Sequence, residues 1–414
     1  MASQDPAKIM VDEPFRIEPV RLAAIGEDLT DAIAALSASA ATLGRALHPS
    51  TAAGLARLVS VMNCYYSNLI EGHNTRPRDI MAALRNEPAP EDAAQRNLVL
   101  EALAHIRVQE QIDQLAAEGA LPEPASPDFI KWVHREFYRD LPRDMLRIKG
   151  RDREFDMIPG DFRSEQAHDV EIGDHLPPAS GTVDAFMRRF AEAYRLEGVR
   201  LGTGIMLMAA AHHRLAFIHP FPDGNGRVGR LISHAMAHKI GIGAHGLWSI
   251  SRGLARGLVP GLEGRGEYKA ALARADMRRQ GDLDGRGNLS ERALADWTLW
   301  FVRVCVDQVD FMSGLFDINA LADRLTRYVR LNDRDLHPAA AGILVEALIR
   351  GEVERGDASR IAGMPERSAR RVVGQLVDKG LLDSSSPRSP LRLAFPADAL
   401  EDLFPRFFFS NAQE

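Results

Sequence analysis

Residues 219–230 read His219-Pro220-Phe221-Pro222-Asp223-Gly224-Asn225-Gly226-Arg227-Val228-Gly229-Arg230. The apolar run before them, over residues 204–218, predicts a buried helix that ends at His219. Pro220 and Pro222 cannot continue a helix, so we expect a short, stiff loop after it. A second helix is predicted from about Arg227, and the N–H groups at its positive end favour an anion.

The residue types in this stretch indicate a site for phosphate groups. Gly224 and Gly226 allow the backbone to turn its N–H groups inward on either side of Asn225. Arg227 and Arg230 are three residues apart, so they lie on one face of the predicted helix and both can point toward a phosphate. An ordinary helix–loop–helix with a solvated turn and surface arginines is the alternative interpretation.

The stretch resembles the signature of the Fic family, H-x-F-x-[D/E]-G-N-G-R-x-x-R, and matches it at every specified position. The resemblance implies a protein adenylyltransferase, a nucleotidyltransferase that moves AMP from ATP to a Tyr, Thr or Ser hydroxyl of a protein. His219 would be the general base. Asp223 carries the hard oxygen ligand that Mg²⁺ prefers and would bind that ion beside the polyphosphate. Backbone N–H groups from Gly224 to Gly226, with the Asn225 side chain, would hold the α-phosphate, and Arg227 would support the β-phosphate.

A second short motif lies in an amphipathic run before the core. Ser67, Glu71 and Gly72 match the family's inhibitory pattern [S/T]-x-x-x-E-[G/N]. In the family this glutamate reaches the second motif arginine, which is Arg230 in this chain, and so blocks the clamp for the γ-phosphate. The resemblance implies autoinhibition, and in such relatives the glutamate can also help to remove AMP.

Two further sets of contacts are implied by the resemblance. Residues 160–178 are expected to form a β-hairpin flap that pairs with a target segment by strand addition, with Arg163 and His168 as flap contacts. Tyr268 lies where relatives place nucleoside-side residues, as does the pair Ser251-Arg252. Because Glu267 precedes Tyr268 where a Tyr pair is common, the adenine and ribose contacts stay open.

The chain of 414 residues is long enough for two or three domains. We predict a mainly α fold with an N-terminal helical region over residues 1–120, a Fic catalytic core over 121–312 and a C-terminal domain over 313–414. Three helices, predicted over residues 338–349, 358–363 and 366–380, precede two short strands and resemble a winged helix-turn-helix. Arg367, Arg370 and Arg371 would lie along the third helix. A docking or dimerisation domain is the alternative to DNA binding.

Composition bears on what the protein binds and in which compartment it works. The net charge of −6 gives the molecule no general attraction for nucleic acid. Cys64 and Cys305 lie in apolar helical patterns, which favours buried thiols in a reducing compartment. Residues 1–20 lack an apolar run, so we expect no secretory signal, no membrane partner and a cytoplasmic location.

Two patterns resemble metal sites but lack the ligands for them. Residues 282–289 have Arg286 at the fifth position of a Ca²⁺ loop, so a capped loop before a helix at Ser290 is expected instead. His212-His213 and the pair His234 and His238 are helix-borne without evident paired acids, and we expect no metal other than Mg²⁺.

Alternatives to the main hypothesis are a Fic scaffold that uses another nucleotide or phospho-donor, and a nucleotide-sensing DNA-binding regulator. An intact pair of Arg227 and Arg230 together with Glu71 favours a nucleoside triphosphate. The sequence does not decide the target protein, self-modification or assembly as a homodimer.

Overall fold

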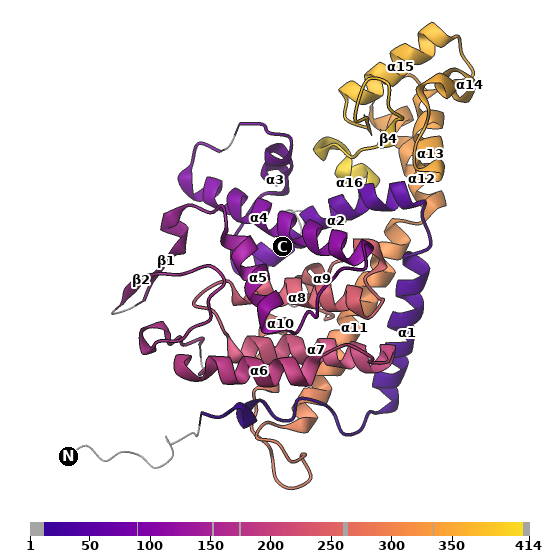
Figure 1. Ribbon diagram of the computed structural model, residues 1–414. Helices are drawn as coiled ribbons and strands as arrows, with labels where there is room; N and C mark the ends of the chain where they lie inside the picture. Colours follow the sequence, from indigo (N-terminus) through magenta and orange to yellow (C-terminus); the bar gives the residue numbers. More distant parts are fainter. Residues whose placement is uncertain are drawn as a thin grey trace, which may run out of the picture. The chain divides into compact units, whose positions relative to one another are not determined.

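The computed structural model describes residues 12–88, 90–150, 153–173, 175–259, 264–333 and 335–408. The expectation of no secretory signal falls partly on residues 1–11, which lie outside the described residues. The described chain is mainly helical, with short two-stranded antiparallel sheets (Figure 1).

The chain divides into two compact units. The first comprises Met1–Ala35, Arg107–Gly241 and Gly253–Cys305, and the second comprises Leu36–Ile106, Ile242–Arg252 and Val306–Glu414. These units are interleaved along the sequence, whereas the three predicted domains are consecutive. Two dividing points fall inside α4 (Ala93–Ala117) and α11 (Glu291–Leu315), where no glycine-, proline- or serine-rich linker marks a boundary.

The first unit holds the motif. Its complete helices and strands are α5 (Pro127–Tyr138), β1 (Arg147–Lys149), β2 (Glu154–Asp156), α6 (Val183–Tyr194), α7 (Leu201–Ile218), α8 (Asn225–Lys239) and α10 (Gly264–Ala275). α7 packs against both α6 and α8, and α5 packs against α8 (Figure 1). Helix α5 is capped by Ser126, whose Oγ accepts from the N–H of Phe129 at 3.3 Å, and Pro127 occupies the first helical position.

Helix α7 is the core helix of this unit. It is long and apolar enough to cross a membrane by length and composition, and 72% of it is buried inside the protein. His212, His213 and Arg214 are buried on it. Because α7 packs against both α6 and α8, its high content of apolar residues is explained by burial inside the protein.

The second unit contains the gating motif and the C-terminal elements. Its complete helices and strands are α2 (Pro49–Ile70), α3 (Pro77–Leu84), α12 (Ile318–Arg327), α13 (Ala340–Arg350), α14 (Ala358–Ala362), α15 (Glu366–Asp378), β3 (Leu382–Asp383), β4 (Arg392–Leu393) and α16 (Leu400–Leu403). α1 (Glu27–Leu43) and α9 (Ile250–Arg256) cross dividing points between the units. The predicted order of three helices and two strands is confirmed for α13 to β4, and β3 pairs antiparallel with β4.

The hairpin predicted over residues 160–178 is reduced to a single antiparallel bridge in the described residues. The described residues there contain a 3₁₀ turn (Gln166–His168) and one isolated bridge between Ile172 and His175. The regular hairpin lies upstream instead, where β1 pairs with β2. The polar residues that alternate in this stretch suggested strands. Outside the bridge, however, the described residues form an irregular segment.

Two smaller expectations are confirmed. Cys64 and Cys305 are buried and unlinked. The loop before α11 is capped, because Asp284 Oδ1 accepts from Ser290 Oγ at 3.0 Å and from the N–H of Arg292 at 2.9 Å. A carboxylate used in this way is a helix cap, as predicted, and the calcium interpretation is unnecessary.

Candidate active site

His219 directly follows α7. Its backbone lies in the left-handed region, with φ 50° and ψ 61°, and its N–H donates to the carbonyl of Leu215 at 3.0 Å. That conformation costs a residue other than glycine roughly 1–3 kcal/mol and persists only where the surroundings impose it. Pro220 prevents a further helical turn. The half-buried imidazole is therefore carried at the end of a rigid, buried helix.

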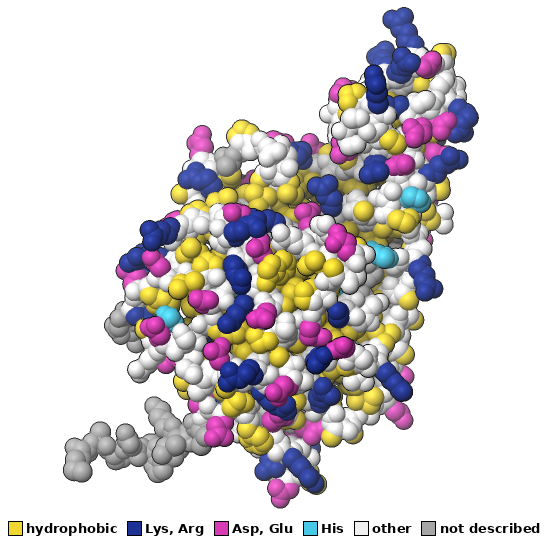
Figure 2. All heavy atoms as spheres, in the orientation of Figure 1, with side chains coloured by type: hydrophobic (Ala, Val, Ile, Leu, Met, Phe, Trp, Pro, Cys, Tyr) yellow, Lys and Arg dark blue, Asp and Glu magenta, His cyan; other side chains and the backbone are white. Residues whose placement is uncertain are grey.

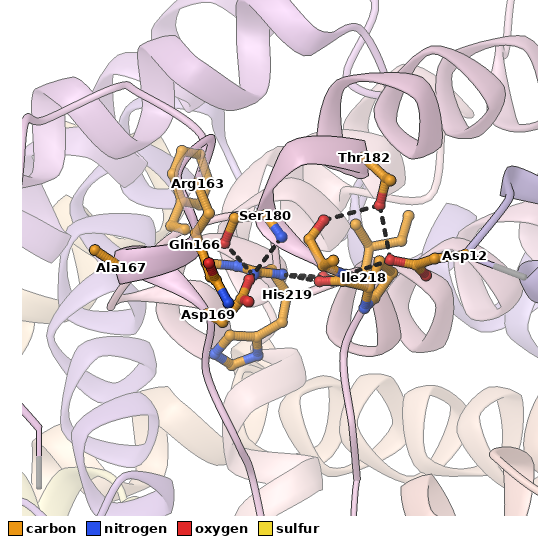
Figure 3. A network of polar contacts seen from close by, with 12 residues as sticks. Asp12, Arg163, Gln166, Ala167, Asp169, Ser180, Thr182, Ile218 and His219 are labelled. Atoms are coloured by element: carbon orange, nitrogen blue, oxygen red, sulfur yellow. Dashed lines mark hydrogen bonds and ion pairs between the residues drawn. The ribbon is translucent and has the colours of Figure 1, made fainter. Parts of the chain in front are cut away.

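The guanidinium of Arg163 holds the carbonyl groups of this turn (Figure 3). Its Nε donates to the carbonyl of His219 at 2.8 Å, and its Nη2 donates to that of Ile218 at 3.2 Å. Nη1 donates to Ser180 Oγ at 2.9 Å, and the backbone N–H of Arg163 donates to the carbonyl of Pro220 at 2.8 Å. Burial lowers the pKa of Arg163 to about 10, so the side chain still carries its charge at neutral pH.

The side chain of Asn225 shapes the loop after His219. Its Nδ2 donates to the carbonyl of Phe221 and its Oδ1 accepts from the N–H of Phe221, both at 2.8 Å. Both ends of the amide are thus used inside the loop. Asn225 therefore closes the loop, and because Nδ2 has a second hydrogen, a contact of this side chain with a phosphate stays a prediction.

Gly224 is required at the N-terminus of α8. Its φ is 77°, and a Cβ at this position would lie 2.7 Å from the Tyr138 hydroxyl oxygen. Glycine brings no side-chain cap, and the first-turn N–H groups of a helix then bond to water or to an anion. Gly226 follows within that first turn.

Asp223 and Arg227 form an ion pair beside this helix start. Arg227 Nη2 lies 3.2 Å from Asp223 Oδ2, and the Tyr138 hydroxyl donates to the same oxygen at 2.8 Å. Burial alone would raise the pKa of Asp223, but the charge of Arg227 and the bond from Tyr138 outweigh it and lower the pKa. Asp223 is therefore ionised at neutral pH. Arg230, one turn further along α8, is buried as well.

Sequence reasoning missed His134, which joins the motif loop to the segment that follows β2. Its ring stacks on Phe221, with centroids 3.9 Å apart and an interplanar angle of 13°. Nδ1 accepts from the N–H of Gly160 at 2.8 Å, and Nε2 faces the carbonyl of Asp223 at 3.3 Å. Burial lowers the pKa of His134 to about 3, so the ring is neutral and Nε2 carries the proton.

A signal for His134 was present in the sequence. Apolar and aromatic residues of α5 recur at Ile130, Val133, Phe137 and Tyr138, which is helical spacing, and His134 falls inside that stripe. A histidine in such a stripe is expected to be buried and bonded. Its partners come from distant segments and could not be named from the sequence.

Tyr268 is placed in the core, where its hydroxyl lies 2.9 Å from Nε2 of His212. Nδ1 of His212 lies 2.7 Å from Ser233 Oγ, which itself donates to the carbonyl of Gly229 on α8. Burial lowers the pKa of His212 to about 3, which keeps this ring neutral too. Tyr268 on α10 therefore contacts α7 through His212, which in turn contacts Ser233 on α8, and a nucleoside contact of Tyr268 stays a prediction.

The predicted flap contacts divide into two kinds. Arg163 is fully buried around the His219 turn, so its assignment as a contact for a target segment is wrong. His168 lies half-buried on the 3₁₀ turn Gln166–His168, and its ring lies 4.5 Å from that of Phe155 on β2. A contact from His168 to a target stays a prediction.

The gating residues belong to the second unit. Ser67 is fully buried in the last turn of α2, and Glu71 follows that helix in a solvent-exposed position. Gly72 has φ 86°, so the chain turns there in a conformation that favours glycine. Since Arg230 belongs to the first unit, the contact between Glu71 and Arg230 stays a prediction.

The first unit therefore brings an imidazole, an ionised carboxylate and two arginines to one helix N-terminus, which is the chemistry of a phosphate-binding site. Residues 124–237 match the sequence profile of the Fic/DOC family. The chain thus contains a Fic/DOC family domain.

Relatives with assigned names share a short segment with this chain. The "Protein adenylyltransferase Fic" of Drosophila erecta is 37% identical over 82 residues, and that of Culex quinquefasciatus is 38% identical over 82 residues. The match covers 20% of this chain and 16% of each relative. This chain is thus distantly related to protein adenylyltransferases over that segment.

One solved structure shares the fold over most of the chain. A Fic family protein from Desulfovibrio desulfuricans G20 aligns with 91% of this chain and 98% of its own length, with a TM-score of 0.52 and 15% sequence identity. At that identity the likeness concerns the fold. The mainly helical Fic fold with short β-hairpins is thereby confirmed.

We predict that His134→Phe weakens the first unit and flattens its pH dependence. Phenylalanine keeps the stacking on Phe221 but leaves the N–H of Gly160 without its acceptor, which costs roughly 1–3 kcal/mol. A histidine whose folded pKa lies below its unfolded value of about 6.5 stabilises the fold above that pH and loses this contribution as the pH falls toward 3. Between pH 7 and 5 the loss is about 2 kcal/mol, and the variant should lack it.

Urea unfolding at pH 7 and pH 5, followed by tryptophan fluorescence, measures both effects. His245→Asn, at an exposed histidine of the second unit whose positive φ an asparagine tolerates, is the control, and its effect should be much smaller than that of His134→Phe. An unchanged pH dependence in His134→Phe would contradict the buried neutral ring.

Proposed function

We propose that this chain is a self-inhibited protein adenylyltransferase that transfers AMP from ATP to a Tyr, Thr or Ser hydroxyl of a protein. One observation carries the proposal: His219 stands at the rigid end of α7, immediately before a loop that leads into the uncapped N-terminus of α8. A base beside an anion site is what attack of a hydroxyl on a phosphate requires. The family match and the distantly related adenylyltransferases support it.

In the proposed reaction His219 takes the proton of the target hydroxyl. The hydroxyl oxygen forms a bond to the α-phosphorus of ATP, and the bond from that phosphorus to the oxygen bridging the α- and β-phosphates breaks. The electron pair of the broken bond leaves with pyrophosphate. The turn held by Arg163 fixes where the base stands, which limits the geometries open to the attacking oxygen.

The start of α8 would hold the negative charge of ATP. Backbone N–H groups of Gly224, Asn225 and Gly226 lie in its cap and first turn and would donate to the α-phosphate. Arg227 would support the β-phosphate and Arg230 the γ-phosphate. Both arginines are buried, so a phosphate that reaches them is bound in a poorly solvated place where charge-assisted bonds are strong.

Asp223 fits the Mg²⁺ that a bound triphosphate brings. It is ionised, its side chain is 47% exposed, and it precedes the helix start where the phosphates would lie. A bound Mg²⁺ would neutralise charge on the α- and β-phosphates. Tyr138 and Arg227 orient the carboxylate for this role through their contacts to Oδ2.

Inhibition is proposed to come from Glu71. Glu71 follows the last turn of α2, in which Ser67 is buried, and the chain turns at Gly72. The backbone from which the carboxylate projects is therefore held in place. A carboxylate on Arg230 would occupy the guanidinium that clamps the γ-phosphate. ATP would then bind with its α-phosphate misaligned for in-line attack. The same glutamate could position a water that removes AMP again.

The proposal also covers the target protein and the cellular compartment. A cytoplasmic protein with an accessible hydroxyl is the proposed substrate, and the chain itself or a second copy in a homodimer is a candidate target. Another donor, such as UTP, GTP, a phosphocholine donor or a whole γ-phosphate, is the alternative on the same scaffold.

The proposal predicts opposite effects for two substitutions. Glu71→Gly should raise incorporation of label from α-phosphate-labelled ATP by tenfold or more, on the order of one charge-assisted contact. His219→Ala in the Glu71→Gly background should abolish it. Radiolabel on the chain and on proteins of a host lysate, with the modified residue found by mass spectrometry, is the readout.

The chain supplies a matched control for Glu71. Glu118 and Gly119 follow α4 as Glu71 and Gly72 follow α2, and Gly119 also has a positive φ, of 68°. Glu118→Gly should leave incorporation at the basal level. Label that arrives only from the γ-position would refute transfer of AMP.

A second candidate function concerns the C-terminal elements of the second unit. We propose that α15 binds DNA as the third helix of a winged helix-turn-helix. Its buried residues are Ala369, Val372, Val373 and Leu376, at helical spacing, while Arg367, Arg370 and Arg371 are exposed on the remaining surface. Figure 2 shows Lys and Arg side chains gathered over this end of the unit. Arg370 is paired with Glu366, so the free charge of the helix is modest.

DNA binding predicts a salt dependence that follows these arginines. For the full chain, log K against log salt should lose a slope of about 2–3 when Arg367, Arg370 and Arg371 are all changed to Gln, because each phosphate contact contributes about 0.9. The double change Arg327→Gln and Arg330→Gln, at exposed arginines of the same unit, is the control. A gel shift without salt dependence, or unaffected by the triple change, would leave the domain as a docking module.

A further inference from the structure

Two histidines and one aspartate converge near the C-terminal end of α8. His234 and His238 lie four residues apart on this helix, so they occupy one face on successive turns. Nε2 of His234 lies 2.6 Å, and Nε2 of His238 lies 2.8 Å, from the same oxygen of Asp113 on α4. The expectation that these histidines lack a paired acid is thus wrong. All three residues belong to the first unit.

We propose that Asp113, His234 and His238 bind one divalent first-row transition-metal ion of the Zn²⁺ type. The ligand atoms of the three side chains lie within 4.8 Å of one another. Two imidazole nitrogens and one carboxylate oxygen are a ligand set that suits Zn²⁺ and its neighbours, whereas Mg²⁺ and Ca²⁺ prefer oxygen alone. This site is separate from the proposed Mg²⁺ position at Asp223.

The arrangement can close around an ion with small movements. The two rings stand at 79° to each other with centroids 4.7 Å apart, and Nε2 of each ring lies within 2.8 Å of Oδ1 of Asp113. Bond lengths of about 2.0–2.1 Å place tetrahedral ligand atoms roughly 3.3 Å apart. The nitrogen-to-oxygen distances would therefore widen by about half an ångström. Rotation of the Asp113 side chain, which is 21% exposed, provides that freedom.

Burial and charge are suited to an ion that enters from solvent. The side chains of His234 and His238 are 7% and 8% exposed, so the nitrogens are held in place, while Asp113 opens to water. Burial would raise the pKa of Asp113, but the charges and bonds of the two histidines outweigh it and lower the pKa. The carboxylate is thus ionised and ready to bind. Three protein ligands leave a fourth position for water.

A second His–Asp–His cluster in the same unit lacks this convergence. Asp276 uses Oδ1 for His213 at 3.0 Å and Oδ2 for His175 at 3.1 Å. The other ring nitrogen of each histidine has a partner as well: Nε2 of His175 faces the carbonyl of Phe217, and Nδ1 of His213 faces Arg214. These three side chains form a hydrogen-bonded network and serve as an internal control.

A bound ion would link α4, through Asp113, to α8, through His234 and His238. His234 lies nine residues after Asn225, which places it about 14 Å along the helix from the phosphate-binding end. The proposed site therefore braces the helix that carries the motif without competing for the motif's own ligands.

The test uses the full chain and Zn²⁺ alone. Metal analysis after dialysis against Zn²⁺ and then metal-free buffer should find one ion per chain. Co²⁺ in place of Zn²⁺ should give visible absorption bands of a four-coordinate ion. Zn²⁺ should raise the Tm, whereas the same concentration of Mg²⁺ should not. His238→Gln and Asp113→Asn should each weaken Zn²⁺ binding roughly tenfold or more.

Asp276→Asn is the matched control and should keep the ion and the Co²⁺ spectrum. His238 lies near the end of α8, so its substitution tests the site even if an exchange at buried His234 prevents folding. Zero stoichiometry, or equal Zn²⁺ binding by wild type, His238→Gln and Asp113→Asn, would overturn the site and leave a hydrogen-bonded cluster only. Because none of these readouts uses AMP transfer, failure here is distinguishable from failure of the proposed function.

Discussion

The turn at His219 depends on one buried charge. A guanidinium in the protein interior is costly unless its donors are matched by acceptors, and Arg163 finds four: the carbonyls of His219, Ile218 and Pro178, and Ser180 Oγ. Removing the charge would leave these acceptors buried without a donor. Arg163 therefore holds His219 in a backbone conformation that residues other than glycine adopt uncommonly.

Two neutral histidines extend this constraint to the rest of the motif. His134 stacks on Phe221 and joins the motif loop to Gly160, while His212 joins α7 to Ser233 on α8. The ring of His134 cannot take a second proton without placing two donors face to face, because its Nδ1 accepts from the N–H of Gly160. The motif is thus held by polar contacts that are satisfied in one geometry, and such a scaffold keeps a base and an anion site in fixed relation.

Helix α8 has different chemistry at its two ends. Its first turn presents backbone N–H groups, with Arg227 and Arg230 one turn apart, and its last turns present His234 and His238 to Asp113. The proposed metal site and the proposed phosphate site therefore lie on the same helix.

Much of the local structure followed from the sequence alone. Helical periodicity and the prolines after His219 predicted the end of α7, and they placed the starts of α7 and α8 within about three residues of those observed, because these signals act within a few residues. The order of α13, α14, α15 and the β3–β4 hairpin followed for the same reason. The hairpin expected over residues 160–178 followed only in part, since a single bridge forms there and the start of the segment is held by the buried Arg163.

The partners of polar side chains were decided by tertiary structure. Asn225 bonds to Phe221, Tyr268 bonds to His212, and Asp113 meets two histidines more than a hundred residues away. A residue's type states which bonds it can make, and the sequence therefore predicted a phosphate site at residues 219–230. Which bonds are made depends on distances between segments that the fold brings together, and no local spacing encodes those distances.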